Sequence, residues 1–127
     1  MSTLEIGNRF VQLIKEHKNR EAIDELYAES VLVNEAMEMP GRENGSFTKQ
    51  SLLDFNDQFF QMMDIHDGGV EGPFPHGDTF IVYMWIDLTP KDGPMAGNRM
   101  MMKEACVYRV ADGKITETHF CYPPMGG

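Results

Sequence analysis

The sequence contains only two cysteines, Cys106 and Cys121, among its 127 residues. Two cysteines are too few for the disulfide framework of a small secreted domain, and they lack the spacing of zinc-binding pairs. The first residues show neither a basic stretch nor an apolar block, so they do not resemble a signal peptide. These absences favour a protein of a reducing compartment, and we expect it to be cytoplasmic.

Positive charge and long apolar runs are scarce as well. The chain has 11 lysines and arginines against 20 aspartates and glutamates, which gives a formal net charge of −9. Because phosphate backbones select basic surfaces, this balance argues against a nucleic-acid partner. The longest apolar run, residues 80–86, is far shorter than the roughly 20 residues that span a bilayer. We therefore expect neither nucleic acid nor a membrane as a partner.

Apolar residues are present in the amount that a compact core requires. Hydrophobic residues make up 42% of the chain and aromatic residues 10%, which is too rich for disorder. The length predicts a single domain over residues 1–127. Eleven methionines suit an adaptable apolar cavity, although methionine is also an ordinary core residue.

Helical patterns dominate the first half. Ser2 and Glu5 have the spacing of a capping box, and apolar residues then recur at helical spacing. Asn19 is placed to cap a second, short helix. A third helix is predicted to begin near Thr48, with one apolar stripe that consists of Leu52, Phe55, Phe59 and Met62.

Strand patterns fill the rest. Residues 31–37 are rich in β-branched side chains and predict a strand that ends at Pro40-Gly41. A short strand at 70–73 is broken by Pro73 and Pro75, and further strands are predicted at 80–86, 100–110 and 114–122. Residues 80–86 are apolar on both faces, so this strand must be covered on both sides. The order predicts an α+β fold, with helices on one face of a curved antiparallel sheet.

Three strings resemble a known family. They are DELYAESVLVNEA, HGDTFIVYMWI and ACVYRVADGKITETHF, and they occur in the family's order. They resemble the first-strand passage, central strand and closing hairpin of the SnoaL-like branch of the nuclear transport factor 2-like superfamily, the relatives of ketosteroid isomerases and polyketide cyclases. The resemblance implies a cone, in which a curved antiparallel sheet wraps around three N-terminal helices and leaves an apolar pocket at its open end. Because such folds host enzymes, binding modules and accessory domains, the resemblance locates a pocket without defining its use.

Glu35 and Glu104 are the leading candidate catalytic residues. By the resemblance, Glu35 falls where ketosteroid isomerases place their proton-abstracting aspartate. Strand alternation puts Glu104 on one face with Met102 and Cys106, and the resemblance turns that face toward the pocket. Loss of hydration in an apolar cone raises the pKa of a carboxyl group, so the two residues are expected to form an acid–base pair. The alternative is that they are solvated or ion-paired.

Other chemistry is less well supported. Cys106 stands where the isomerases keep a protonated aspartic acid, and Phe10 stands where they keep a tyrosine donor. Because both donors of that oxyanion hole are missing, a copy of the steroid isomerases is not expected. His76, in a stiff loop before residues 80–86, is a candidate proton carrier or else a solvent-facing turn residue. No two of the four histidines have short metal-binding spacing, so we expect no metal and no cofactor.

The register of the closing hairpin decides which side chains line the pocket. A two-residue turn at Asp112-Gly113 pairs Val110 with Ile115 and sets His119 opposite Cys106. A three-residue loop over 111–113 with a bulge pairs Cys106 with Thr118 instead, and we favour this register. The cysteines then face opposite sides. The predicted ligand-binding residues are Phe10, Phe55, Phe59, Phe80, Met84, Met102, Cys106, Thr118, Phe120 and Tyr122.

An outward apolar stripe consists of Ile81, Tyr83 and Trp85. Relatives commonly dimerise through this surface, so we predict a homodimer; the alternative is that the loop at 89–99 covers the stripe. We interpret the chain as a protein that binds a small, mostly apolar ligand and catalyses cofactor-independent isomerisation, cyclisation, hydration or hydrolysis. The alternatives are a non-catalytic ligand-binding or dimerisation module, and an enzyme that uses His76 or His119 with a carboxylate.

Overall fold

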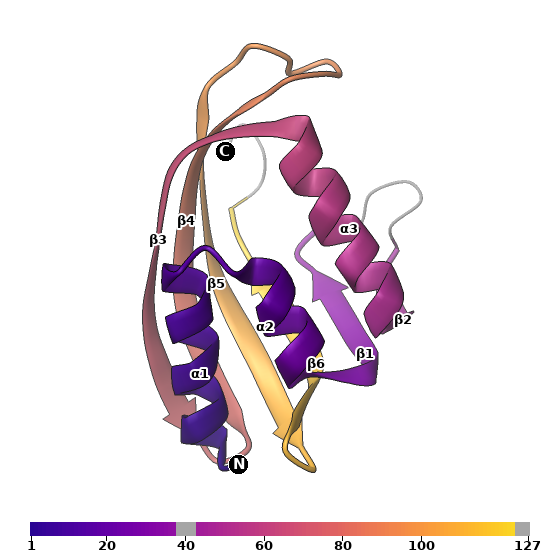
Figure 1. Cartoon of the computed structure of the whole chain (residues 1–127), viewed down its shortest axis with the longest axis vertical. Coiled ribbons are helices and arrows are strands. Elements are labelled where there is room, and N and C mark those ends of the chain that lie inside the picture. Colours follow the sequence, from indigo (N-terminus) through magenta and orange to yellow (C-terminus); the bar gives the residue numbers. More distant parts are fainter. Residues whose placement is uncertain (38–42, 124–127) are drawn as a thin grey trace.

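The computed structural model of the protein describes residues 1–37 and 43–123, and it contains three helices and six strands (Figure 1). The predicted strand end at Pro40-Gly41 lies outside these residues. Within the described ranges, no helix has both the length and the apolar character needed to cross a membrane. In chain order the elements are α1 (Thr3–Lys15), α2 (Asn19–Leu26), β1 (Tyr27–Glu35), β2 (Gly45–Thr48), α3 (Lys49–Met62), β3 (Met63–His76), β4 (Thr79–Pro90), β5 (Met100–Ala111) and β6 (Lys114–Cys121).

The six strands form one curved sheet in the order β2-β1-β6-β5-β4-β3. The α+β prediction is confirmed, but the sheet is mixed, because β1 and β6 pair in parallel while the other neighbours are antiparallel. Parallel strands run in the same direction, so β1 and β6 end at the same edge of the sheet. The chain segments that follow Glu35 and Cys121 therefore start close to one another.

The helices lie on one side of the sheet (Figure 1), where α1 packs against β3 and β4 and α3 packs against β1, β2 and β3. The core between these layers contains a cluster of three buried rings. Phe10 of α1 and Phe80 of β4 lie with their ring centroids 4.7 and 5.1 Å from that of Tyr108 on β5. Gly7 allows α1 to approach β3, because an added methyl group would lie 2.8 Å from Cβ of Pro73.

The helix starts follow local sequence in two cases of three. The capping box is confirmed, since the backbone N–H groups of Ser2 and Glu5 each donate to the other's side chain. The prediction that the third helix begins near Thr48 is confirmed, and the Thr48 side chain caps α3 by accepting the N–H of Ser51. The prediction that Asn19 caps α2 is wrong: Lys18 occupies the cap position, and Asn19 is the first helical residue. The tight turn through His17, whose φ is 61°, starts the helix one residue earlier than the predicted cap at Asn19 implied.

The prolines do not limit β3 to the short strand that was predicted. The strand runs for 14 residues along β4 and shifts its register between Glu71 and Phe74. Proline lacks a backbone donor, but β3 is an edge strand, where one side of the backbone needs no partner strand. The sequence pattern also missed β2 and the first four residues of β1.

The turn of the closing hairpin has two residues, so the favoured three-residue loop is wrong. Asp112 and Gly113 have φ of 51° and 75°, as a tight hairpin turn requires, and Val110 pairs with Ile115. The register then shifts between Arg109 and Val110.

This shift decides which β6 side chains face the helices. Beyond it, Tyr108 pairs with Thr118 and Cys106 pairs with Phe120. Thr118 and Phe120 therefore share a face with the buried Cys106, whereas His119 faces the other side. The buried Cys106 and the exposed Cys121 are both free thiols.

Candidate active site

Glu35 is the last residue of β1, and it lies on the inner face of the sheet, the face that the helices cover. It shares this face with Val33, which is buried, and its partner on β6 is Phe120. The side chain of Asn44 anchors its backbone: the Glu35 N–H donates to Asn44 Oδ1 at 2.9 Å, and Asn44 Nδ2 donates to the Glu35 carbonyl at 3.3 Å. The backbone from which the half-buried Glu35 side chain extends is therefore anchored at the end of β1.

Tyr122 contacts this carboxyl group directly. It is the first residue after β6, and its hydroxyl group donates to Glu35 Oε2 at 3.1 Å. The same hydroxyl oxygen accepts the N–H of Met37 at 3.3 Å. Burial raises the pKa of Tyr122, the backbone of Met37 opposes this shift, and the negative charges of Glu35 and Glu104 add to it. Tyr122 is therefore a neutral donor beside both carboxyl groups.

Glu104 lies on the inner face of β5, opposite Met84 of β4 and two residues from Cys106. Burial raises the pKa of Glu104, and the negative charge of Glu35 raises it further, while the Cys106 thiol opposes the shift. Glu104 therefore keeps its proton to a higher pH than an ordinary carboxyl group. The structure places the two predicted carboxyl groups on one face of the sheet, on the two strands that flank β6, where the charge of Glu35 acts on Glu104.

Polar groups continue from Glu104 into the core. Cys106, Tyr108 and Tyr27 are buried, and burial is the largest cause of the raised pKa of each. All three side chains are therefore neutral at physiological pH. Neither Tyr27 nor Tyr108 was among the predicted site residues. Alternation from Glu104 places Tyr108 on the same face of β5, whereas Tyr27 is the first residue of β1 and lies before the strand predicted at 31–37.

Thr118 lies beside Tyr108 in this interior. Its side chain is only 1% exposed, and among the described residues its hydroxyl oxygen has no hydrogen-bond partner. A buried polar group without a partner is uncommon and costs stability. The Thr118 hydroxyl group therefore lowers the stability of the fold relative to an apolar side chain of the same shape.

The other predicted ligand-binding residues fall into two groups. Phe10, Phe80, Cys106 and Thr118 are buried within the packed core. The rest are more accessible: Met102 is 44% exposed, and the half-buried residues are Phe55, Phe59, Met84, Phe120 and Tyr122. Only this second group offers apolar surface that a ligand can reach without rearranging the core.

His76 does not join the carboxyl pair. It is exposed at the end of β3, where it pairs with Thr79. Thr79 is five residues along β4 from Met84, the neighbour of Glu104, and at the usual rise per residue this separates them by about 17 Å. The expectation that His76 acts with Glu35 and Glu104 is therefore not supported by its position.

His119 also points away from the pair. On the outer face, its Nε2 lies 2.6 Å from Oε2 of Glu117 and 3.5 Å from Nδ2 of Asn34. The alternative in which His119 joins the pocket carboxylates is wrong, because the register shift in β6 sends it to the opposite face. Across residues 1–37 and 43–123, no three histidine, cysteine or acidic side chains are grouped to hold a metal ion.

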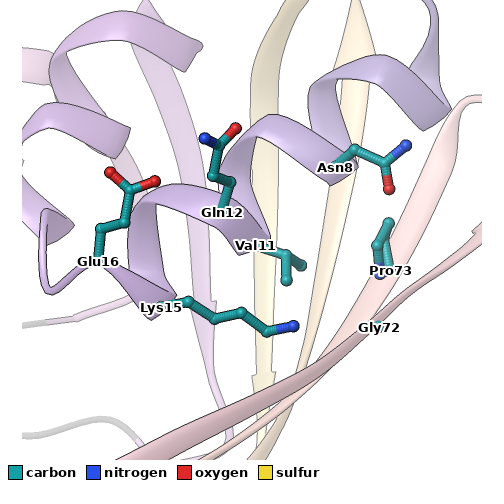
Figure 2. A pocket seen from close by; sticks show the side chains of 7 residues that line it. All are labelled: Asn8, Val11, Gln12, Lys15, Glu16, Gly72 and Pro73. Atoms are coloured by element: carbon teal, nitrogen blue, oxygen red, sulfur yellow. The ribbon is translucent and has the colours of Figure 1, made fainter.

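Two grooves lie elsewhere on the surface. One, of about 470 Å³, separates α1 from β3, and Figure 2 shows the side chain of Lys15 extending from α1 toward β3. It is lined by Asn8, Val11, Gln12, Lys15, Glu16, Gly72 and Pro73. The other, of about 150 Å³, lies on α3. Neither groove is lined by Glu35 or Glu104, so an apolar hollow beside them stays a prediction.

The outer face of the sheet carries the predicted apolar stripe. Ile81 is 39% exposed and Tyr83 is 36% exposed, while Trp85 packs so closely over Gly69 that a methyl group there would overlap the indole ring. Residues 91–99 are exposed and project beyond the ends of β4 and β5 (Figure 1). The alternative that this loop covers the stripe is therefore wrong.

The sequence and the structure are similar to those of known proteins. Residues 1–122 match the profile of the SnoaL-like domain. A structure from Mesorhizobium loti, assigned as a SnoaL-like polyketide cyclase with carbohydrate phosphatase as a second description, is 35% identical with a TM-score of 0.86. The match covers 96% of this chain and all of that one. No curated protein matches the sequence.

More distant structures share the fold alone. A nuclear transport factor 2-like protein from Burkholderia thailandensis is 17% identical, with a TM-score of 0.78 over 97% of this chain and 92% of that one. A protein from Bacillus subtilis assigned as an isomerase is 14% identical, with a TM-score of 0.73 over 98% and 91% of the two chains.

Proposed function

The chain belongs to the SnoaL-like domain family, and on that premise we propose that it binds a small, mostly apolar carbonyl compound and moves a proton on it. The observation that supports this proposal is the pairing of Glu104, a half-buried carboxyl group with a raised pKa, with Glu35 on the same face. Acid–base chemistry needs two groups that hold different protonation states at one pH. The assignment of the similar Mesorhizobium loti protein as a polyketide cyclase agrees with carbonyl chemistry.

The two carboxyl groups have different roles in this proposal. Glu35, as a carboxylate, removes a proton from the carbon next to the ligand's carbonyl group. Glu104, in its protonated form, gives its proton to the carbonyl oxygen, so that an enol forms and the charges of the two residues exchange. Reversal of the two transfers at another carbon isomerises the ligand, whereas attack of the enol carbon on a second carbonyl group closes a ring. Both proton transfers are supplied by the protein.

The apolar part of the ligand is expected to cover accessible side chains beside the carboxyl pair. Met84 is the strand neighbour of Glu104, and Phe120 is the strand neighbour of Glu35. Met102 lies two residues before Glu104 on the same face of β5 and is 44% exposed. These flexible and aromatic side chains suit an apolar body whose carbonyl group points toward Glu104.

A neutral dye tests this proposal without knowledge of the natural ligand. Nile red fluorescence is measured across the pH range in the wild type, in Glu104→Gln and in Glu71→Gln, which replaces an exposed glutamate of β3. We expect dye binding to weaken as Glu104 ionises, with this transition lost in Glu104→Gln and kept in Glu71→Gln. A pH-independent response in the wild type would instead favour the alternative, a non-catalytic ligand-binding module.

We also propose that the protein is a cytoplasmic homodimer that joins through its outer sheet face. The exposed Ile81 and Tyr83 support the dimer, because the helices cover only the other face of the sheet and the loop at 91–99 leaves the stripe open. A second copy would bury this apolar surface.

A further inference from the structure

We propose that Tyr122 is a positioning residue, whose hydroxyl group holds the Glu35 carboxylate on the side that faces Glu104. The inference deepens the proposed function, on which it rests, because it concerns the same carboxyl pair. Its basis is the 3.1 Å hydrogen bond from the Tyr122 hydroxyl group to Glu35 Oε2. Tyr122 itself transfers no proton to or from the ligand in this proposal.

The strand registers place Tyr122 between the two acids. In the parallel pair, Glu35 is level with Phe120, two residues before Tyr122. In the antiparallel pair, Ala105 is level with Cys121, so one further step brings Tyr122 level with Glu104. Because β6 lies between β1 and β5, its continuation carries the tyrosine along the gap between the two carboxyl groups.

The backbone of Met37 orients the hydroxyl group. Its N–H donates to the tyrosine oxygen at 3.3 Å, which leaves the hydroxyl proton to be donated elsewhere. Two acceptors are within reach: Glu35 Oε2 at 3.1 Å and the Met37 carbonyl at 3.4 Å. The shorter contact is to an oxygen of the charged group, and such hydrogen bonds are the stronger ones.

Several groups of the described residues act on Glu104 and Tyr122. Glu104 is affected by Glu35 from β1 and by Cys106 on its own strand, while Tyr122 is affected by both acids and by the Met37 backbone. Tyr27 and Tyr108 are neutral and lie deeper. Burial is the largest cause of the raised pKa of Glu104, and the negative charge of Glu35 adds to it. The size of this second contribution depends on where the Glu35 carboxylate is held.

The test is a titration of the Glu104 carboxyl carbon by NMR in protein labelled at glutamate. The variants are Tyr122→Phe, Glu35→Gln and a matched control, Tyr83→Phe, which removes a hydroxyl group from the outer face. We expect the midpoint of the Glu104 titration to move to lower pH in Glu35→Gln. The same midpoint should move in Tyr122→Phe by at least half as much, and it should not move in Tyr83→Phe. An unchanged titration in Tyr122→Phe, beside a shifted one in Glu35→Gln, overturns the proposal.

A second measurement needs no change at Tyr122. The ring of Tyr122 is titrated in the wild type and in Glu35→Gln, where loss of the neighbouring charge should lower the pKa of the hydroxyl group. An unchanged value contradicts the contact. These results are independent of ligand binding: if Nile red shows no pH-dependent binding while the Glu104 shift occurs, the proposed function fails and the positioning role stands.

Discussion

Glu35 and Glu104 lie on the two strands that flank β6, and the negative charge of Glu35 adds to burial in raising the pKa of Glu104. Glu104 thus keeps its proton to a higher pH than an ordinary carboxyl group, mainly through burial and further through the charge of Glu35. The consequence extends beyond ligand chemistry, because a pKa that differs between the folded and unfolded states makes stability depend on pH.

Replacing Glu104 by glutamine should stabilise the protein at neutral and alkaline pH. Below the ordinary pKa of 4.5, Glu104 is protonated in both the folded and the unfolded states. As pH rises through the raised pKa of the folded state, ionisation of the buried group costs stability. In urea unfolding at several pH values, the free energy of unfolding of Glu104→Gln should rise relative to that of the wild type as the pH increases from 4.5 through the raised pKa. Glu71→Gln is the control, and an equal gain there contradicts the assignment.

Thr118→Val should raise the free energy of unfolding by about 1 kcal/mol. Valine has nearly the shape of threonine and removes a buried hydroxyl oxygen that has no partner among the described residues. Thr116→Val is the matched control, because the hydroxyl group of Thr116 donates to the Arg109 carbonyl at 3.5 Å. If chemical denaturation shows Thr118→Val to be less stable than the wild type, the hydroxyl group has a stabilising partner.

Gly7→Ala should destabilise the protein by about 1 kcal/mol, although alanine favours helix by a similar amount. The added methyl group would lie 2.8 Å from Cβ of Pro73 and 3.3 Å from the ring of Phe80, so α1 must move away from β3. Thermal and urea unfolding measure the loss. Asn8→Ala, at the exposed next position, is the control and should be neutral or slightly stabilising; an equal response at both sites argues against close packing at Gly7.

A double variant, Ile81→Lys with Tyr83→Lys, should convert the proposed dimer into a monomer. Two charges on the apolar stripe would have to be buried between the copies, and an unpaired buried charge is costly. Sedimentation velocity measures the oligomeric state, and Leu4→Lys, which alters an exposed apolar residue of α1, is the control. A wild-type protein that is monomeric, or a double variant that still dimerises, contradicts this interface.

The faces of the long strands could be predicted from the sequence because side chains alternate. Alternation correctly groups Glu104 with Met102 and Cys106, and the family resemblance correctly places Glu35 on the same inner face. The closing hairpin could not be predicted in this way. A bulge near Thr116 exchanges the faces of all later β6 residues, and its position depends on pairing with β5.

Polar contacts between distant segments also could not be predicted from the sequence. Tyr122 was predicted only as a pocket residue, and its hydrogen bond to Glu35 arises because β1 and β6 pair in parallel and end together. Residues 85 or more apart meet there, and no local spacing encodes such a meeting. Likewise, the sequence offered His76 as a candidate proton carrier, but its position at the end of β3 separates it from both acids.

By itself, the sequence determined the family, the order of the three helices and of the strands other than β2, and the presence of two acids on strands that face the core. Local propensity and side-chain alternation are properties of neighbouring residues, so they can be read in one dimension. Only the tertiary structure decided which acid has the raised pKa and which tyrosine contacts the other acid, because burial and charge act between segments that the sheet alone brings together.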